Sequence, residues 1–126
     1  MDNFDQTASR RDQGLDVLHT LSGGGDAQGH ANALINDLGP IGSFVVDHVF
    51  GSVWARAELS RRDRSLIVVA ILVAMGGQPR QLTVHAAVAL NHGLSPDELR
   101  EIAIHLSGYA GFPKAIEATR VINEVI

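Results

Sequence analysis

The sequence contains no cysteine, and this absence excludes several classes of chemistry. Without thiols the chain cannot form disulfide bonds, bind zinc through thiolates or act as a thiol peroxidase. Aromatic residues are also scarce, at 5% of the 126 residues. Alanine, leucine, valine and isoleucine therefore supply most of the apolar side chains, which is typical of closely packed helices.

Long apolar runs and an excess of positive charge are missing too. The longest apolar run, residues 66–75, is about half as long as the roughly 20 residues that a membrane-spanning helix needs. The net charge of −4 disfavours binding to nucleic acid. Residues 1–9 are polar and lack the apolar core of a secretion signal. We therefore expect a cytoplasmic protein without a membrane or nucleic-acid partner.

The spacing of apolar residues and the helix-capping signatures predict an all-α fold of five to six helices. At this length we expect a flexible tail at residues 1–8 and a single helical domain over residues 9–126. The glycine-rich stretch 22–29 is expected to be a loop. Helical patterns cover residues 9–21, 31–38, 41–56, the run between Ser60 and Gly76, residues 79–91 and 96–110, and the chain from Pro113 onward.

Apolar side chains almost encircle residues 66–75. A helix that is apolar on all sides has to be buried on all sides. One small domain can rarely cover such a helix. We therefore expect this helix to pack against another subunit, and the protein to be a homo-oligomer.

Several histidines are candidates for chemistry. His85 shares a helical stripe with Leu82, Ala86 and Ala89, so it is either a core histidine satisfied by its neighbours or a general acid or base near neutral pH. His92, near the end of its helix, is expected to be a cation-capable residue favoured by the helix dipole. The seven-residue spacing of these two histidines, with no carboxylate between them, disfavours a metal site.

A second track, Glu101, His105 and Tyr109, follows at intervals of four residues and shares one helix face. In this track a carboxylate one turn from a histidine would raise the histidine's pKa and hold its ring. The alternative is an ordinary solvated or interface face. The sequence leaves both interpretations open.

Arginine and the rare aromatic residues supply the remaining candidates. The basic residues of interest are Arg56, Arg61, Arg62, Arg64 and Arg80. A guanidinium binds a carboxylate through two parallel hydrogen bonds, so these arginines either anchor an anionic substrate or form a solvated face. Trp54 and Tyr109, the only tryptophan and tyrosine, are either core or interface residues or the walls of a small pocket.

Residues 51–118 resemble the carboxymuconolactone decarboxylase family, which is related to the alkylhydroperoxidase D-like proteins. The resemblance rests on GSVWARAELSRRDRSLIVVAILVAMGG at 51–77, the spacing of His85 and Gly93, the turn SPDEL at 95–99 and YAGFP at 109–113. RDQGLDVLHTL at 11–21 is similar to the family's first helix, whereas residues 22–40 match poorly.

The resemblance implies an alkylhydroperoxidase D-like helical fold assembled as a homo-oligomer, a trimer or a hexamer. In the peroxidase branch two cysteines would fall on Gln78 and Gln81, and a glutamate would fall near Ser65. Because this chain has glutamines and a serine there, the resemblance argues against thiol peroxidase activity.

The decarboxylase branch fits better because it needs no thiol, metal or organic cofactor. Its substrate class is a small anionic lactone or keto acid, such as 4-carboxymuconolactone, which yields 3-oxoadipate enol-lactone and CO2. By this resemblance His85 is the catalytic donor or acid. Arg62 and Arg80 are the candidate carboxylate anchors, and Trp54 and Tyr109 the candidate pocket walls.

Two alternatives remain open at the level of sequence. A family member recruited to lactone hydrolysis or isomerisation would use the same scaffold and histidine, since function lies in the site and not in the fold. A non-catalytic oligomeric protein is the other alternative. The second predicts that His85 is buried, fully hydrogen-bonded and far from any pocket.

Overall fold

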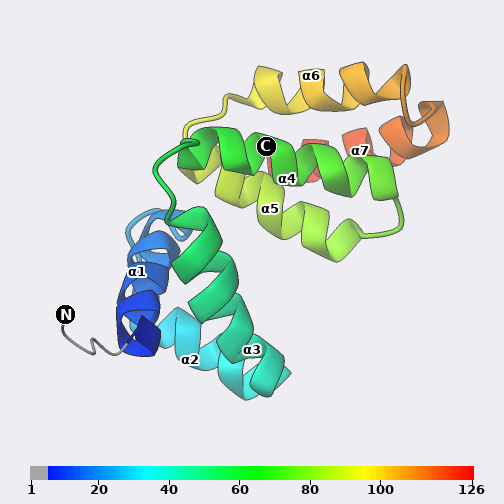
Figure 1. Cartoon of the computed structure of the whole chain (residues 1–126). Coiled ribbons are helices and arrows are strands. Elements are labelled where there is room, and N and C mark those ends of the chain that lie inside the picture. Colours follow the sequence, from blue (N-terminus) through cyan, green and yellow to red (C-terminus); the bar gives the residue numbers. More distant parts are fainter. Residues whose placement is uncertain (1–5) are drawn as a thin grey trace. The chain divides into compact units, whose positions relative to one another are not determined.

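The computed structural model describes residues 6–126, which form two compact units divided between residues 59 and 60 (Figure 1). In the described part every regular element is a helix, which confirms the all-α prediction. The first unit contains α1 (Gln6–Leu21), α2 (Ala27–Leu38), α3 (Pro40–Phe44) and the π-helix η1 (Val45–Trp54). The second contains α4 (Arg61–Met75), α5 (Pro79–Asn91), α6 (Pro96–Ser107) and α7 (Phe112–Val125). The single domain expected over residues 9–126 stays a prediction.

The first unit differs in detail from the sequence-based expectation. Residues 1–5 of the expected tail lie outside the described residues, and residues 6–8 already belong to α1. The expected loop at 22–29 is shorter, because the Asp26 side chain accepts a hydrogen bond from the Gly29 backbone N–H at 3.0 Å and starts α2 at Ala27. The helix expected at 41–56 is instead a short α-helix followed by a π-helix.

Helices α1 and η1 approach each other so closely that two glycines are required between them. A Cβ atom on Gly51 would lie 2.1 Å from the backbone oxygen of Arg10, and one on Gly14 would lie 2.2 Å from that of Val46. Arg11 also reaches across and binds Asp47 with both ends of its guanidinium, one of these contacts measuring 2.9 Å. The two glycines therefore permit the close approach of α1 and η1, and the ion pair of Arg11 with Asp47 stabilises it.

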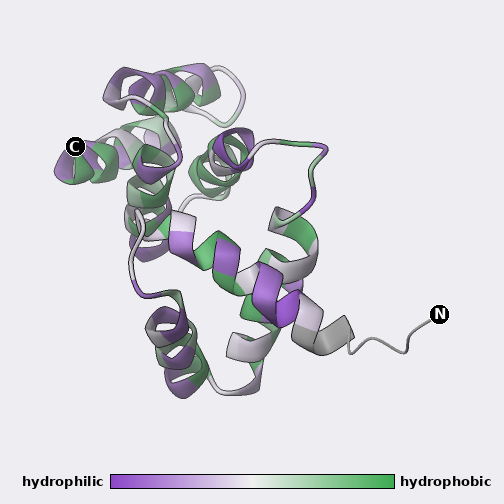
Figure 2. Ribbon diagram, turned by 90° about the vertical axis from the view of Figure 1, so that its left-hand side faces the viewer, coloured by the Kyte–Doolittle hydropathy of each residue, from purple (hydrophilic) through white to green (hydrophobic). Residues whose placement is uncertain are grey.

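The second unit is a four-helix arrangement around one apolar core (Figure 2). The buried core residues are Val69, Val73, Leu82, Ala86, Ala89, Leu94, Leu99, Ile102, Ala103, Ala118 and Ile122. The predicted caps are present: Ser60 accepts from the Asp63 backbone N–H at 3.0 Å, and Ser95 and Glu98 form a reciprocal capping box. Gly76 ends α4 with a positive φ of 67°, a conformation that favours glycine.

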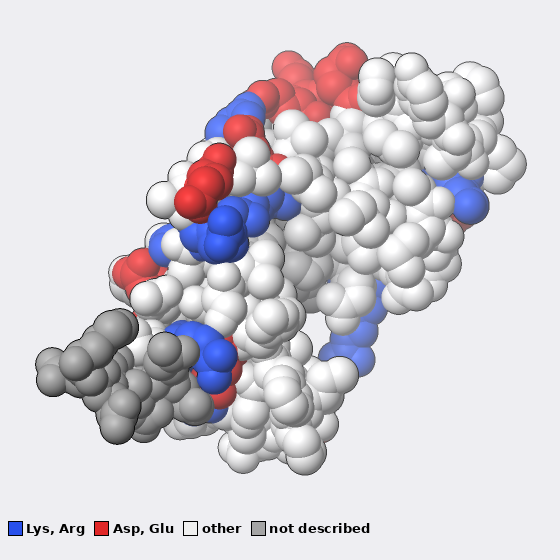
Figure 3. Space-filling view, viewed as in Figure 1, with Lys and Arg blue, Asp and Glu red and all other residues white. Residues whose placement is uncertain are grey.

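One side of α4 is apolar and exposed. Ile67, Ile71 and Met75, spaced four residues apart, are 44%, 50% and 59% exposed, whereas Val69 and Val73 on the opposite side are buried in the core. Figure 3 shows a largely uncharged surface over the C-terminal half of α4. Apolar residues thus lie on both sides of α4, but only one side is buried within this chain. The oligomer expected from it stays a prediction.

None of the helices within residues 6–126 combines the length and the hydropathy needed to cross a lipid bilayer. The apolar run of residues 66–75 instead lies inside α4, which starts with the charged residues Arg61 to Arg64. Its apolar character is therefore accounted for by the core on one side and the exposed stripe on the other.

Candidate active site

The candidate site lies on the face of α5 that turns toward α4. His92, at the end of α5, is bonded to Ser65 of α4: the Ser65 hydroxyl oxygen lies 2.7 Å from His92 Nδ1. His85 lies seven residues before His92, which is close to two full helical turns, so the two rings share this face. Gln81, one turn before His85, belongs to the same stripe.

His85 is half-buried and carries an unsatisfied polar atom. Its Nδ1 atom is buried and meets no hydrogen-bond partner among the described residues. Burial lowers the pKa of His85 below its usual value near 6.5, so the ring is neutral at pH 7. A buried polar atom without a partner is costly and is uncommon in native proteins. The unpartnered Nδ1 does not match the fully hydrogen-bonded histidine that the non-catalytic alternative predicts. His85 lines none of the four cavities described for residues 6–126, which matches the other part of that alternative.

The pair formed by Ser65 and His92 was not foreseen from the sequence. Ser65 is only 1% exposed, so its hydroxyl depends on His92 for a hydrogen bond. Burial and then the nearby positive charge of Arg61 lower the pKa of His92. This shift runs opposite to the one that the negative end of a helix dipole would cause. The sequence gives one hint of the Ser65 and His92 pair: Ser65 stands near the position where the peroxidase branch has its glutamate.

These two lowered pKa values predict a loss of stability in weak acid. Histidine in the unfolded chain titrates near pH 6.5. Around and below that pH, His85 and His92 bind protons more readily in the unfolded chain than in the folded chain, where their pKa values are lower. Their contribution to the free energy of unfolding is present above about pH 6.5 and is lost as the pH falls through the lower folded values. Urea unfolding at pH 7.5 and pH 5.5 measures this loss.

The matched comparison is the double variant His85→Gln and His92→Gln. Because glutamine does not titrate, the variant should lose less stability than the wild type between the two pH values. An equal loss in both proteins would assign the pH dependence to other groups.

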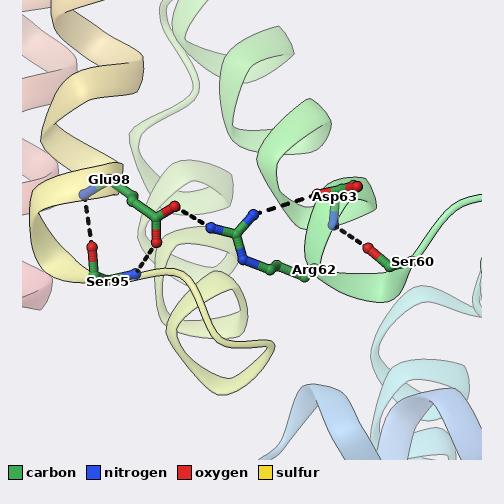
Figure 4. A network of polar contacts seen from close by, with 5 residues as sticks. All are labelled: Ser60, Arg62, Asp63, Ser95 and Glu98. Carbon is green, nitrogen blue, oxygen red and sulfur yellow. Dashed lines mark hydrogen bonds and ion pairs between the residues drawn. The ribbon is translucent and has the colours of Figure 1, made fainter.

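Arg62 is already engaged within the chain (Figure 4). Its guanidinium binds Glu98 of α6 and lies 3.4 Å from the carboxylate of Asp63. The Ser95 backbone N–H and Arg62 together hold the pKa of Glu98 below its usual value. This network joins the capped start of α4 to the capping box of α6. A substrate carboxylate at Arg62 would have to compete with Glu98.

The other predicted residues lie in different places. Arg80 is exposed at the start of α5, and its five-residue offset from His85 places it about 140° around the helix. Tyr109 is 82% exposed just after α6, with its ring 5.2 Å from that of His105. Trp54 is 5% exposed within the first unit and packs edge to face on Phe50 at 6.1 Å.

Helical spacing thus puts Gln81, His85 and His92 on one face of α5, where His92 binds Ser65 of α4. Arg62 and Arg80 stand at the starts of α4 and α5. The roles predicted for Arg62, Arg80, Trp54 and Tyr109 stay predictions. Within residues 6–126, no group of three or more acidic or histidine side chains is placed to hold a metal ion.

Comparison with known proteins gives the family. The chain is 33% identical over 120 residues to the 4-carboxymuconolactone decarboxylase of Acinetobacter baylyi, an alignment that covers 92% of this chain and 86% of that protein. It is also 33% identical over 84 residues to the nitrosuccinic acid decarboxylase of Metarhizium robertsii, covering 65% of this chain and 57% of that protein. Residues 40–124 match the model of the carboxymuconolactone decarboxylase family, and the chain belongs to this family.

Proposed function

We propose that the protein is a cofactor-independent decarboxylase of a small dicarboxylate, with His85 as its catalytic residue. The observation that carries the proposal is the buried, unpartnered Nδ1 of a neutral histidine on the α5 face, in a family whose named relatives are decarboxylases. The absence of thiols removes peroxidase chemistry from consideration.

The two substrates named by the relatives share chemical features. 4-Carboxymuconolactone and nitrosuccinic acid each carry two carboxylates and one electron-withdrawing group, a conjugated lactone or a nitro group. When the bond from carbon to the leaving carboxylate breaks, its electron pair moves onto an oxygen of that group. A proton then replaces CO2 on the carbon skeleton. We infer a substrate of this class, with 4-carboxymuconolactone as the first candidate.

The α5 face supplies groups that such a reaction needs. A neutral imidazole donates a hydrogen bond to the oxygen on which charge develops, and after protonation it serves as the acid that delivers a proton to carbon. The side-chain amide of Gln81, one turn away, is a second donor of the right kind. The low polarity that lowers the pKa of His85 also favours loss of a charged carboxylate as neutral CO2.

The guanidinium of Arg62 is bound to Glu98, so the anchoring role predicted for Arg80 is the one to test first. We expect Arg80→Gln to raise KM about tenfold or more with a smaller change in kcat, since it removes binding that substrate and transition state share. The control Arg100→Gln removes an exposed arginine of α6 and should leave both constants unchanged. A fall in kcat at constant KM would contradict the anchoring role.

The direct test is a spectrophotometric assay of purified protein with 4-carboxymuconolactone, and in parallel with nitrosuccinate, with the released CO2 measured in each case. Turnover of either compound with one equivalent of CO2 supports a decarboxylase. Consumption without CO2 supports the alternative of a lactone hydrolase or isomerase. If the folded protein turns over neither compound, then neither is its substrate, and the non-catalytic alternative is favoured.

We also propose that the exposed stripe on α4 mediates self-association into a trimer or hexamer in the cytoplasm. Ile71→Asp places a charge in the middle of the stripe and should shift the protein to monomers, because a buried unpaired charge is costly. Thr83→Asp, at an exposed position of α5, is the matched control and should leave the assembly intact. Sedimentation velocity measures both, and an unchanged oligomer in Ile71→Asp would exclude this face.

A further inference from the structure

A cavity of about 350 Å³ lies within the second unit, between the end of α4, the start of α5 and α7. Its walls are aliphatic and come from all three helices: Leu72, Val73, Leu82, Ala118 and Val121. The volume lies at the lower end of the range for small-molecule sites. Leu82 faces it one turn before His85, so the cavity opens beside the candidate active site and is lined by different residues.

The rim of the cavity holds a fixed ammonium group. Lys114, the only lysine in the chain, donates a hydrogen bond from Nζ to the backbone oxygen of Ala74 at 3.0 Å. Its side chain lies along Gly76, where a Cβ atom would stand 3.2 Å from its Cγ. The last turn of α4 therefore positions this ammonium at the mouth of the cavity.

Other charges near the mouth favour an anion. Helix α5 starts at the rim with Gln78 and Pro79, and no side chain caps its first turn. That turn carries the partial positive charge of a helix N-terminus. Glu117 is the opposing carboxylate in the rim. The ammonium of Lys114 and the start of α5 together outweigh the single carboxylate of Glu117, so the mouth above the apolar interior is net positive.

We propose that this cavity binds a small monocarboxylate with an apolar body of about six carbon atoms. A cavity of about 150 Å³ accommodates benzene, so the volume here suffices for the body and some water. The carboxylate lies at Lys114 and the start of α5, and the body lies among the aliphatic walls. The site is independent of the decarboxylase proposal, because its occupancy is measured without any turnover.

The single lysine makes occupancy directly observable. Protein labelled with [ε-13C]lysine gives one lysine signal, from Lys114, and 15N labelling reports the amides of Gly76 and Gly77 on the rim. Titration with hexanoate should move these signals together and saturably. Hexanamide has the same shape without the charge, and hexylamine has the opposite charge. Each should bind at least about two- to fivefold more weakly than hexanoate.

Three variants test the arrangement of charges and walls. Glu117→Gln should tighten hexanoate about two- to fivefold, whereas Glu124→Gln, further along α7, should leave it unchanged. Lys114→Met, followed through the glycine amides, should weaken it by a similar factor. Val121→Phe fills the cavity from a half-buried wall position and should abolish binding in a protein that melts like the wild type.

The proposal has clear contrary outcomes. Equal affinity for hexanoate and hexanamide, together with no effect of Lys114→Met, would overturn the assignment of a carboxylate. The absence of a saturable shift, or hexanoate binding that survives Val121→Phe in full, would overturn the site itself.

Discussion

Replacing His85 with alanine is expected to lower the turnover of the decarboxylation substrate at least about 100-fold, the usual contribution of a positioned general acid or base. The ring is neutral because burial lowers its pKa, and its Nδ1 has no protein partner among the described residues, so alanine removes the donor without breaking an internal hydrogen bond. Steady-state kinetics on the folded variant measures the effect. KM should change far less than kcat.

The matched control for this prediction is His30→Ala, which removes an exposed histidine of α2. It should keep full turnover and an unchanged melting temperature. His85→Gln keeps a side chain that donates a hydrogen bond but cannot deliver a proton near pH 7, so partial activity in this variant would separate donation from proton transfer. Wild-type turnover in His85→Ala would remove His85 from the mechanism.

A second large effect is expected in the first unit, from adding one methyl group to Gly51. The new Cβ would lie 2.1 Å from the backbone oxygen of Arg10, a position that no rotamer change relieves. Helices α1 and η1 would have to separate, which also disturbs the ion pair of Arg11 with Asp47. We expect Gly51→Ala to lower the free energy of unfolding by about 3 kcal/mol or more. Urea unfolding followed by circular dichroism measures it.

Gly108→Ala is the control, since Gly108 has ordinary helical angles and the nearest atom to its added Cβ is 3.7 Å away. Here alanine should be neutral or stabilise the fold by about 0.5 kcal/mol, through lower entropy of the unfolded chain. If the two variants had the same stability, the close approach of α1 and η1 would not be a tight packing constraint.

The second unit was more predictable from sequence than the first. The ends of α4 and α6 depend on local signals, namely the Ser60 cap, the Ser95 and Glu98 capping box and Gly76, and these act within a few residues. The π-helix η1 is different, because it packs closely against α1, which lies more than thirty residues away in the chain. No local pattern encodes that approach, although Gly14 and Gly51 are its trace in the sequence.

The candidate site shows the same division. His85 was singled out from its motif, and the catalytic role predicted for it stays a prediction. The bond between Ser65 and His92, and the engagement of Arg62 by Glu98, each join residues of two different helices. Such pairs depend on how the helices pack, which periodicity along one helix does not reveal.

The unpartnered Nδ1 of His85 has a consequence for the tautomer of its ring. In many enzymes a carboxylate or carbonyl holds the Nδ1 proton, and the other nitrogen then has one defined role. Within residues 6–126 no group does this for His85, so the two neutral tautomers are closer in energy than in such enzymes. In the proposed decarboxylase such a ring presents either a donor or an acceptor, and the substrate selects between them. We expect this freedom to let one histidine act on substrates whose electron-withdrawing groups differ, with no change elsewhere in the fold.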